Sequence, residues 1–269
     1  MQPAAGHAPK RVLSEELHKT CSCVTLIETK GANPQPGTNM KTRVPTLCVT
    51  FWLLLGPLLP CVTRAQQIDL LPLPKPRTHG GKPLLEALQE RRSLRAFRPD
   101  PLPPEMLGNL LWAAFGVNRP DGHRTAPSAM NHQEIDVYVA TAEGVYVYDG
   151  RSHALRRIHG RDVRAATGRQ DFVARAPVNL VLVADWSRMS RVPEEKKPVW
   201  SAVSAGAIVQ NVYLFCASEG LATVVRGTFD EAGLARALEL RPGQKIVVAQ
   251  TVGWPADSGR AGTRPSESR

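Results

Sequence analysis

The sequence predicts an α+β fold, in which helices cover both faces of a β-sheet. Ile and Val occupy every second position in residues 135–140, and a second alternating run, residues 145–148, follows a Glu-Gly turn; this is typical of two antiparallel strands. Residues 178–184 are apolar throughout, which indicates a strand buried on both faces and helices above and below it. Residues 199–219 have the length and composition of a long helix that ends at Gly220.

Ahead of this domain the chain carries a segment typical of a secretory signal peptide. Residues 1–39 are polar and rich in turn formers, so we expect them to be disordered or to be an extension of the gene model. Residues 40–65 then present basic side chains, an apolar run and a small-residue site ending at Ala65, in the order of a signal peptide. Because such a signal stands at the N-terminus, we expect translation to start at Met40.

The leader also predicts where the protein resides. With Met40 as the start, we expect an exported, periplasmic protein without a stable membrane anchor; with an earlier start, we expect a cytoplasmic one. A membrane span is the alternative, but Gly56, Pro57 and Pro60 interrupt an apolar run that is already short for a bilayer. A lipoprotein signal at Cys61 is a further alternative, which the preceding proline disfavours.

Cysteine usage and charge exclude several classes of protein. Only Cys216 of the five cysteines follows residue 65, so one mature subunit has neither a disulfide framework nor a cysteine metal site. Cys216 falls in an apolar helix, where we expect a small buried residue. The formal net charge is +10, but the basic residues are scattered and no nucleic-acid motif is present, so we expect no nucleic-acid partner.

The first part of the domain is predicted to be short helices joined by extended segments. Prolines and glycines in residues 66–82 indicate an extended linker. The leucine spacing in residues 83–90 predicts a short helix. Four prolines in residues 99–104 predict an extended segment after it. A second helix is expected from Glu105, with Gly116 ending it.

The middle of the domain contains a long loop and a basic stretch. Residues 118–131 lack periodicity and are rich in turn formers, and a loop of this length is often functional. The basic residues 151–169 are expected to be helical in part. In the long helix, small residues from Ala202 to Val212 form a stripe suited to close packing, either at a dimer axis or as a central core helix.

The chain then returns to the sheet. Residues 221–225 predict a short strand, and Thr228 begins a capping-box pattern for a helix through Leu240. Residues 245–252 predict the last strand, and residues 256–269 have the composition of a disordered tail.

Basic side chains are concentrated where the first short helix ends. Arg91, Arg92 and Arg95 lie within five residues, together with the hydroxyl of Ser93. Guanidinium groups hold phosphate or carboxylate by paired hydrogen bonds, so the cluster would suit a phosphorylated ligand. The alternative is that these residues only offset the dipole of the helix.

Three separate stretches together resemble the nitroreductase family of flavin enzymes, over about residues 84–255. They are the Arg-x-Ser-x-Arg-x-Phe run at residues 91–97, the Pro-Ser-Ala-x-Asn loop at residues 127–131, and Arg-Gly-Thr-Phe-Asp at residues 226–230. Residues 124–129 and 206–211 look most like the branch that contains azoline-forming dehydrogenases.

The resemblance implies a fold and an assembly. The expected fold is a three-layer sandwich over residues 83–255, with a central, mostly antiparallel sheet flanked by helices. The expected assembly is a homodimer that binds FMN at its interface, each loop 127–131 reaching the flavin of the other subunit.

The resemblance also assigns roles to residues. Arg91 and Ser93 would meet the phosphate, Arg95 would lie near N1 and O2 of the ring, and Asn131 would bond the pyrimidine edge. An amide near Gly227 would face N5, and Gln170 would face the ring unless it is an exposed residue at a helix end. The predicted cofactor-binding residues are Arg91, Arg92, Ser93, Arg95, Pro127, Ser128, Ala129, Met130, Asn131, Gln170, Arg226, Gly227 and Thr228.

The implied activity is that of an FMN-dependent oxidoreductase. NAD(P)H would reduce FMN, and the flavin would pass electrons to a small acceptor such as a nitroaromatic or a quinone. The flavin carries the hydride, so no catalytic protein side chain and no metal are expected. Two alternatives remain: a dehydrogenase of peptide azolines, which needs a peptide-binding partner, and a non-catalytic flavin-binding protein.

Overall fold

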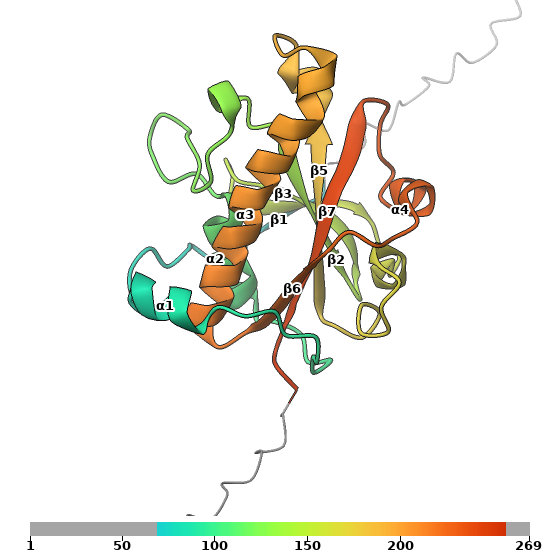
Figure 1. Cartoon of the computed structure of the whole chain (residues 1–269). Coiled ribbons are helices and arrows are strands. Elements are labelled where there is room, and N and C mark those ends of the chain that lie inside the picture. The colour runs from blue at the N-terminus through green and yellow to red at the C-terminus, as the bar shows by residue number, and fades with distance from the viewer. Residues whose placement is uncertain (1–68, 257–269) are drawn as a thin grey trace, which may run out of the picture. The chain divides into compact units, whose positions relative to one another are not determined.

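A computed structural model describes residues 69–256 (Figure 1). All of them belong to the compact unit Val62–Arg269. The predicted leader segments, residues 1–39 and 40–65, lie outside the described residues, as does all but the first residue of the predicted tail.

A seven-stranded sheet forms the centre of this unit, in the order β1-β4-β3-β2-β5-β7-β6. Every strand pairing is antiparallel, which confirms the predicted sheet. The strands are β1 (Leu70–Pro72), β2 (Ile135–Thr141), β3 (Gly144–Asp149), β4 (Ala154–His159), β5 (Val178–Asp185), β6 (Ala222–Arg226) and β7 (Gln244–Gly253).

Helices lie on both faces of the sheet, as Figure 1 shows. The α-helices are α1 (Leu84–Glu90), α2 (Pro104–Phe115), α3 (Lys197–Glu219) and α4 (Glu231–Ala237). The 3-10 helices are η1 (Ala129–Asn131), η2 (Arg164–Thr167), η3 (Trp186–Met189) and η4 (Glu194–Lys196). The first three α-helices cover one face, and α4 covers the other.

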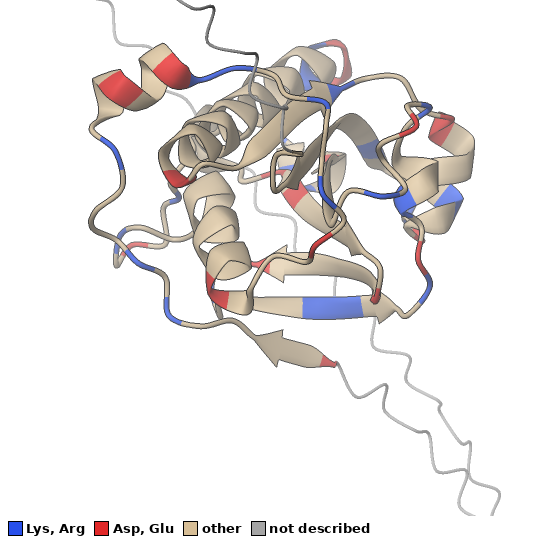
Figure 2. Cartoon of the chain, turned by 90° about the horizontal axis from the view of Figure 1, so that it is seen from below, with Lys and Arg blue, Asp and Glu red and all other residues tan. Residues whose placement is uncertain are grey.

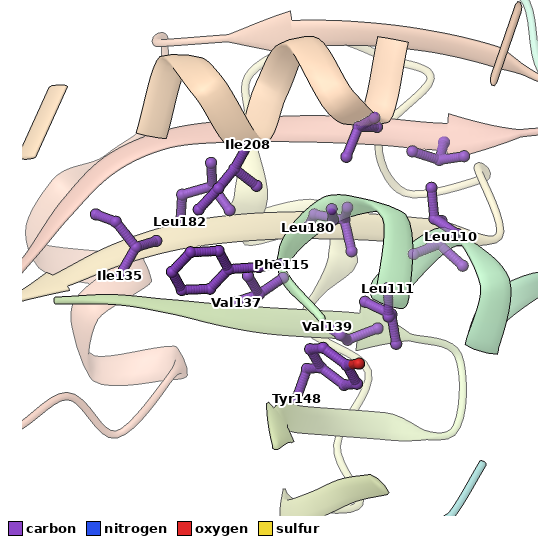
Figure 3. Packing of buried hydrophobic residues seen from close by; sticks show 14 of the residues in the cluster. Leu110, Leu111, Phe115, Ile135, Val137, Val139, Tyr148, Leu180, Leu182 and Ile208 are labelled. Atoms are coloured by element: carbon purple, nitrogen blue, oxygen red, sulfur yellow. The ribbon is translucent and has the colours of Figure 1, made fainter. Parts of the chain in front are cut away.

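Strand β5 explains the three layers, because its side chains alternate between two cores. Leu180 and Leu182 pack with α2 and α3, where Ile208 lies over the sheet (Figure 3). Val181 and Val183 point to the opposite face and pack in a cluster that includes Leu234 and Leu238 of α4 and its C-cap. Both faces of β5 are therefore fully buried, as the continuous apolar run predicted.

Helix α3 crosses the sheet on its larger core. Ala205 and Val212 are buried against the sheet, whereas Ala202 and Gly206 are exposed, so the predicted small-residue stripe is divided between two faces of the helix. Gly220 ends α3 with a left-handed φ of 73°, as predicted. Residues 194–219 are long and apolar enough to cross a membrane, a test that a partly buried core helix also passes.

Two strands at one edge of the sheet differ from the prediction. Residues 151–169 were expected to be helical in part, and the structure has the short 3-10 helix η2 there, but residues 154–159 form β4. Strand β1 lies inside the predicted linker. The two pair with each other, with Leu71 opposite Leu155. The strand β4 was missed because Arg156 and Arg157 are exposed while the two residues before them are buried, so the strand has no regular alternation.

Helix α4 also starts later than the capping-box pattern predicted. Its N-cap is Asp230, which makes no side-chain capping bond, and it ends at Ala237. The carbonyl of Thr228 instead accepts a hydrogen bond from Arg169 at 3.2 Å. Thr228 is therefore part of a loop contact and not of the helix.

Candidate cofactor site

The segment that carries the arginine cluster, residues 91–97, is tied down along both sides. The amide of Leu94 donates to Thr223 of β6 at 3.0 Å. On its other side, Ala96 accepts from the amide of Ala256 at 3.0 Å, and Phe97 bridges to Pro255. The segment thus lies between β6 and the end of the domain, and its backbone is held without being part of a named strand.

A cavity of about 1010 Å³ opens beside this segment. Arg91, Arg92 and Arg95 line it, and Tyr213 and Cys216 of α3 line it as well. Burial raises the pKa of the Cys216 thiol, so this side chain behaves as an apolar residue, as predicted. The volume is at the upper end of what ligand pockets have, at roughly 300–1,000 Å³.

The arginines of the cavity are not neutralised by neighbouring acids. None of the three guanidinium groups forms an ion pair within residues 69–256. Glu90 lines the same cavity but pairs with Lys82. Figure 2 shows the basic segment directly after the acidic residues of α1. An excess of positive charge in a cavity favours an anionic ligand.

Tyr213 supports the cluster from α3, and sequence reasoning missed it. The Arg91 guanidinium lies 5.1 Å from the centre of the Tyr213 ring. The tyrosine hydroxyl lies 2.8 Å from Ser93 Oγ and accepts a hydrogen bond from the Val225 amide at 3.0 Å. The only available signal was one tyrosine in an otherwise apolar helix segment.

Gln170 and the turn after β6 lie at the same edge of the protein. The Arg169–Thr228 hydrogen bond joins their two loops, and the Phe172 ring lies 5.3 Å from the Phe97 ring. The Gln170 Oε1 atom is buried and has no hydrogen-bond partner among the described residues. Gln170 is therefore partly buried with a free acceptor, and not an exposed residue at a helix end.

Arg226 was predicted to bind the cofactor, but its side chain points into the protein. It is 5% exposed, and burial lowers its pKa to about 10. Its guanidinium donates to Thr167 O at 2.6 Å, Asn179 Oδ1 at 2.9 Å and Thr251 Oγ1 at 3.0 Å. Arg226 thus anchors the segment that precedes Gln170 and has little left to offer a ligand.

The predicted loop, residues 127–131, lies at the other end of α3 from the arginines (Figure 1). Arg188 of η3 donates to the carbonyl of Gln133, and Trp186 of η3 donates to Ser201 near the start of α3. None of the five loop residues lines the cavity. One subunit therefore lines the cavity with the three arginines. Gln170 and Thr228 lie in two loops that a hydrogen bond joins, but neither residue is part of the cavity lining, and neither is any residue of the loop.

The loop has an unusual backbone. Met130, Asn131 and Gln133 have φ values of 49°, 53° and 48°, in the left-handed region that non-glycine residues rarely adopt. The Ser128 hydroxyl accepts from the Gln133 amide at 2.9 Å and so stabilises the turn. The Met130 side chain is 68% exposed. The turn therefore presents an apolar side chain to the outside of the subunit.

The residues next to this loop contain buried polar atoms that have no hydrogen-bond partner within residues 69–256. Glu134 is 0% exposed, and neither carboxylate oxygen has a hydrogen-bond partner within residues 69–256. His132 Nε2 is buried in the same condition. Within the same part of the chain, no cluster of three or more His, Cys, Asp or Glu side chains could hold a metal ion.

The protein is thus of the α+β class, with helices on both faces of an antiparallel sheet. The cavity at the edge of the sheet is lined by cations and suits an anionic ligand. Residues 88–254 match the model of the nitroreductase family. A Methanocaldococcus jannaschii protein, named as a proposed nitroreductase, is 33% identical to this chain over 168 residues. The match covers 59% of this chain and 85% of that protein. The chain belongs to the nitroreductase family.

Solved structures agree with this membership. A structure from Ralstonia eutropha JMP134, named as a proposed nitroreductase, is 44% identical with a TM-score of 0.67, over 70% of this chain and 90% of that one. The microcin synthetase complex McbBCD of Escherichia coli contains a chain with the same fold, at 18% identity and a TM-score of 0.56, over 69% and 78% of the two chains.

Membership makes the protein an oxidoreductase of the FMN type, and the residues of the site fit this cofactor. Three unpaired guanidinium groups and a serine hydroxyl suit the phosphate. Arg91, Arg92 and Arg95 line the cavity and would hold FMN there. Ser93 would join them from its position 2.8 Å from the hydroxyl of Tyr213, which lines the same cavity.

Proposed function

We propose that the protein is a homodimeric oxidoreductase that takes hydride from NAD(P)H and reduces a small acceptor such as a nitroaromatic or a quinone. Bound FMN supplies the hydride chemistry. Arg91, Arg92 and Ser93 bind its phosphate, and Arg95 stabilises the negative charge that collects near N1 and O2 on reduction. The loop 127–131 of the second subunit completes the pocket.

The observation that carries this proposal is that the two predicted parts of the cofactor site, the arginine cavity and the loop 127–131, lie at opposite ends of α3. The arginine cavity lies at the C-terminal end of the helix, and the loop 127–131 lies at the N-terminal end. A helix of 23 residues is about 35 Å long, so these halves do not meet in one subunit. A two-fold axis across the middle of α3 would set each half against the other half of the partner.

Exposed apolar side chains support the same assembly. Near the C-terminal end of α3, helix α1 exposes Leu84, Leu85 and Leu88. Near its N-terminal end, α3 exposes Val199, Trp200 and Val203. Between them, a side chain placed at Gly206 would meet no atom within 4 Å, so another helix has room to approach closely. Exposed apolar side chains that gather in this way are typical of interaction surfaces.

The first experiment is the absorbance spectrum of the full chain supplied with FMN, recorded without oxygen before and after addition of NADPH or NADH. Bound oxidised flavin that bleaches with either donor supports the proposal. Bound flavin that does not bleach contradicts the donor and favours an azoline dehydrogenase or a flavin-binding protein. The absence of bound flavin contradicts the assignment of the cavity.

We also propose that the protein is exported, because residues 40–65 have the order of a signal peptide. Expression from Met40 in a bacterial host, followed by fractionation and N-terminal sequencing, tests this. A periplasmic product that begins at Gln66 supports export. A cytoplasmic product with an intact leader contradicts it.

A further inference from the structure

The Tyr213 hydroxyl stands between two hydrogen-bonding groups with different roles. On one side, the Val225 amide of β6 lies 3.0 Å away and can only donate. On the other side, Ser93 Oγ lies 2.8 Å away and can either donate or accept. The tyrosine oxygen therefore accepts on the first side, which leaves its own hydrogen for the second.

From this geometry we propose that Tyr213 is a positioning residue that orients Ser93 as a hydrogen-bond donor to the phosphate of the cofactor. The phenol is more acidic than the serine hydroxyl and so is the better donor of the two. When Ser93 accepts from Tyr213, its own hydrogen is free to point at an anion. The inference rests on the proposed binding of FMN in the arginine cavity.

The same side chain also holds a second phosphate ligand. The Arg91 guanidinium lies 5.1 Å from the ring centre, within the range of about 6 Å for a cation–π contact. Tyr213 is only 6% exposed and sits on α3, which packs on the sheet. One rigid residue thus contacts both Arg91 and Ser93.

This support matters because the two ligands have little other restraint. Ser93 is exposed and Arg91 is half-buried, at the point where α1 gives way to an extended segment. Ordering such side chains on binding costs conformational entropy. Contacts that exist before binding lower this cost, so Tyr213 increases the affinity for the phosphate without reaching the ring of the flavin.

The test compares FMN with riboflavin, which has the same ring but no phosphate. Tyr213→Phe removes the hydroxyl and keeps the ring under Arg91. The expected result is that the Kd of the full chain for FMN rises about tenfold while the Kd for riboflavin changes less than twofold, both measured by flavin fluorescence. An unchanged ratio of the two Kd values overturns the proposal.

A double-mutant cycle separates positioning from general destabilisation. Since Tyr213 acts through Ser93, Tyr213→Phe should weaken FMN binding little further in a Ser93→Ala background; additive losses overturn the proposal. Tyr148→Phe is the matched control, because that buried hydroxyl also has a 2.9 Å partner, His153, and does not line the cavity. It should lower the Tm and leave FMN binding unchanged.

Two further outcomes keep the inference separate from the proposed function. If the wild-type chain binds neither FMN nor riboflavin, the proposed function fails. If Tyr213→Phe does not fold, Ser93→Ala alone is decisive, because Ser93 is exposed and the variant should fold. That variant must show a reduced preference for FMN over riboflavin, because the arginines remain; an unchanged preference overturns the inference.

Discussion

The regions at the two ends of α3 differ in how far the polar groups there find hydrogen-bond partners within a single subunit. At the C-terminal end, Tyr213, Ser93 and the Val225 amide satisfy one another, and the arginine segment is bonded on both sides. At the N-terminal end, the loop has three left-handed residues, and the buried carboxylate of Glu134 has no partner within residues 69–256. The proposed dimer accounts for this difference, because the partner subunit would contact the loop.

Energies make the contrast concrete. A left-handed non-glycine residue costs roughly 1–2 kcal/mol, although Asn tolerates it better. A buried polar side chain without a hydrogen-bond partner costs about 1–3 kcal/mol. Such costs persist where the surroundings enforce them, and they are common at ligand sites. The proposed dimer would place this costly loop over the partner's cavity, where it has a function.

The largest expected effect comes from separating the two subunits of the proposed dimer. Val203→Glu places a carboxylate on the exposed apolar side of α3 and should give a monomer. FMN affinity should fall by more than about 100-fold, or ~2.7 kcal/mol, although the arginine cavity is untouched. Light scattering and flavin fluorescence measure both effects.

The control for this prediction is Ala232→Glu, an exposed residue of α4 on the opposite face of the sheet. It should change neither assembly nor affinity. A Val203→Glu monomer that binds FMN like the wild type would contradict the prediction, because the arginine cavity of one subunit would then be sufficient for FMN binding.

A second prediction concerns the C-terminal end alone. Arg95→Ala removes a cation that has no ion-pair partner in the described part of the chain, so folding should be little affected. Charged hydrogen bonds contribute about 1.5–3 kcal/mol, so FMN affinity should fall roughly 10- to 100-fold. Arg95→Lys keeps the charge and should lose less. Full flavin occupancy in Arg95→Ala would refute the assignment of this residue.

A third prediction concerns the N-terminal end. Glu134→Gln replaces an unpartnered buried carboxylate by a neutral group of the same shape. In the Val203→Glu background it should raise the free energy of unfolding by about 1–2 kcal/mol, measured with urea. Glu143→Gln, at an exposed position in the turn between β2 and β3, should have no effect. A loss of stability in the Glu134 variant would mean that its carboxylate is satisfied within the subunit.

The smallest effect is expected at the strained turn. Met130→Gly relieves a left-handed φ of 49° but increases the freedom of the unfolded chain, so the net gain in stability should be about 0.5 kcal/mol. Asn131→Gly should gain less, because Asn adopts this conformation more readily. A clear loss on Met130→Gly would indicate that the exposed methionine side chain contributes contacts in the dimer.

Much of the fold was predictable because burial leaves a local pattern. The apolar run 178–184 indicated a central strand with helices on both faces, and that layering is confirmed. Strands β1 and β4 were missed because the edge strand β1 has only three residues and its neighbour β4 is half-exposed, so both patterns are weak. Their pairing joins Leu70–Pro72 to residues more than 80 positions away, which local periodicity cannot show.

The site was predictable where its chemistry is contiguous in sequence. Arg91, Ser93 and Arg95 fall within five residues, and the structure places their segment beside a cavity. The role of Tyr213 depends on a contact across 120 positions, and the inward direction of Arg226 depends on which face of β6 is covered. Both are tertiary properties, so no local pattern predicted them.

The bonds between residues 96–97 and residues 255–256 also have a consequence for biosynthesis. They join the beginning of the domain to its end, so the cavity cannot be formed until residue 256 has left the ribosome. Cofactor loading must therefore follow completion of the chain. For an exported chain that crosses the membrane unfolded, loading would take place on the far side, from whatever flavin is available there.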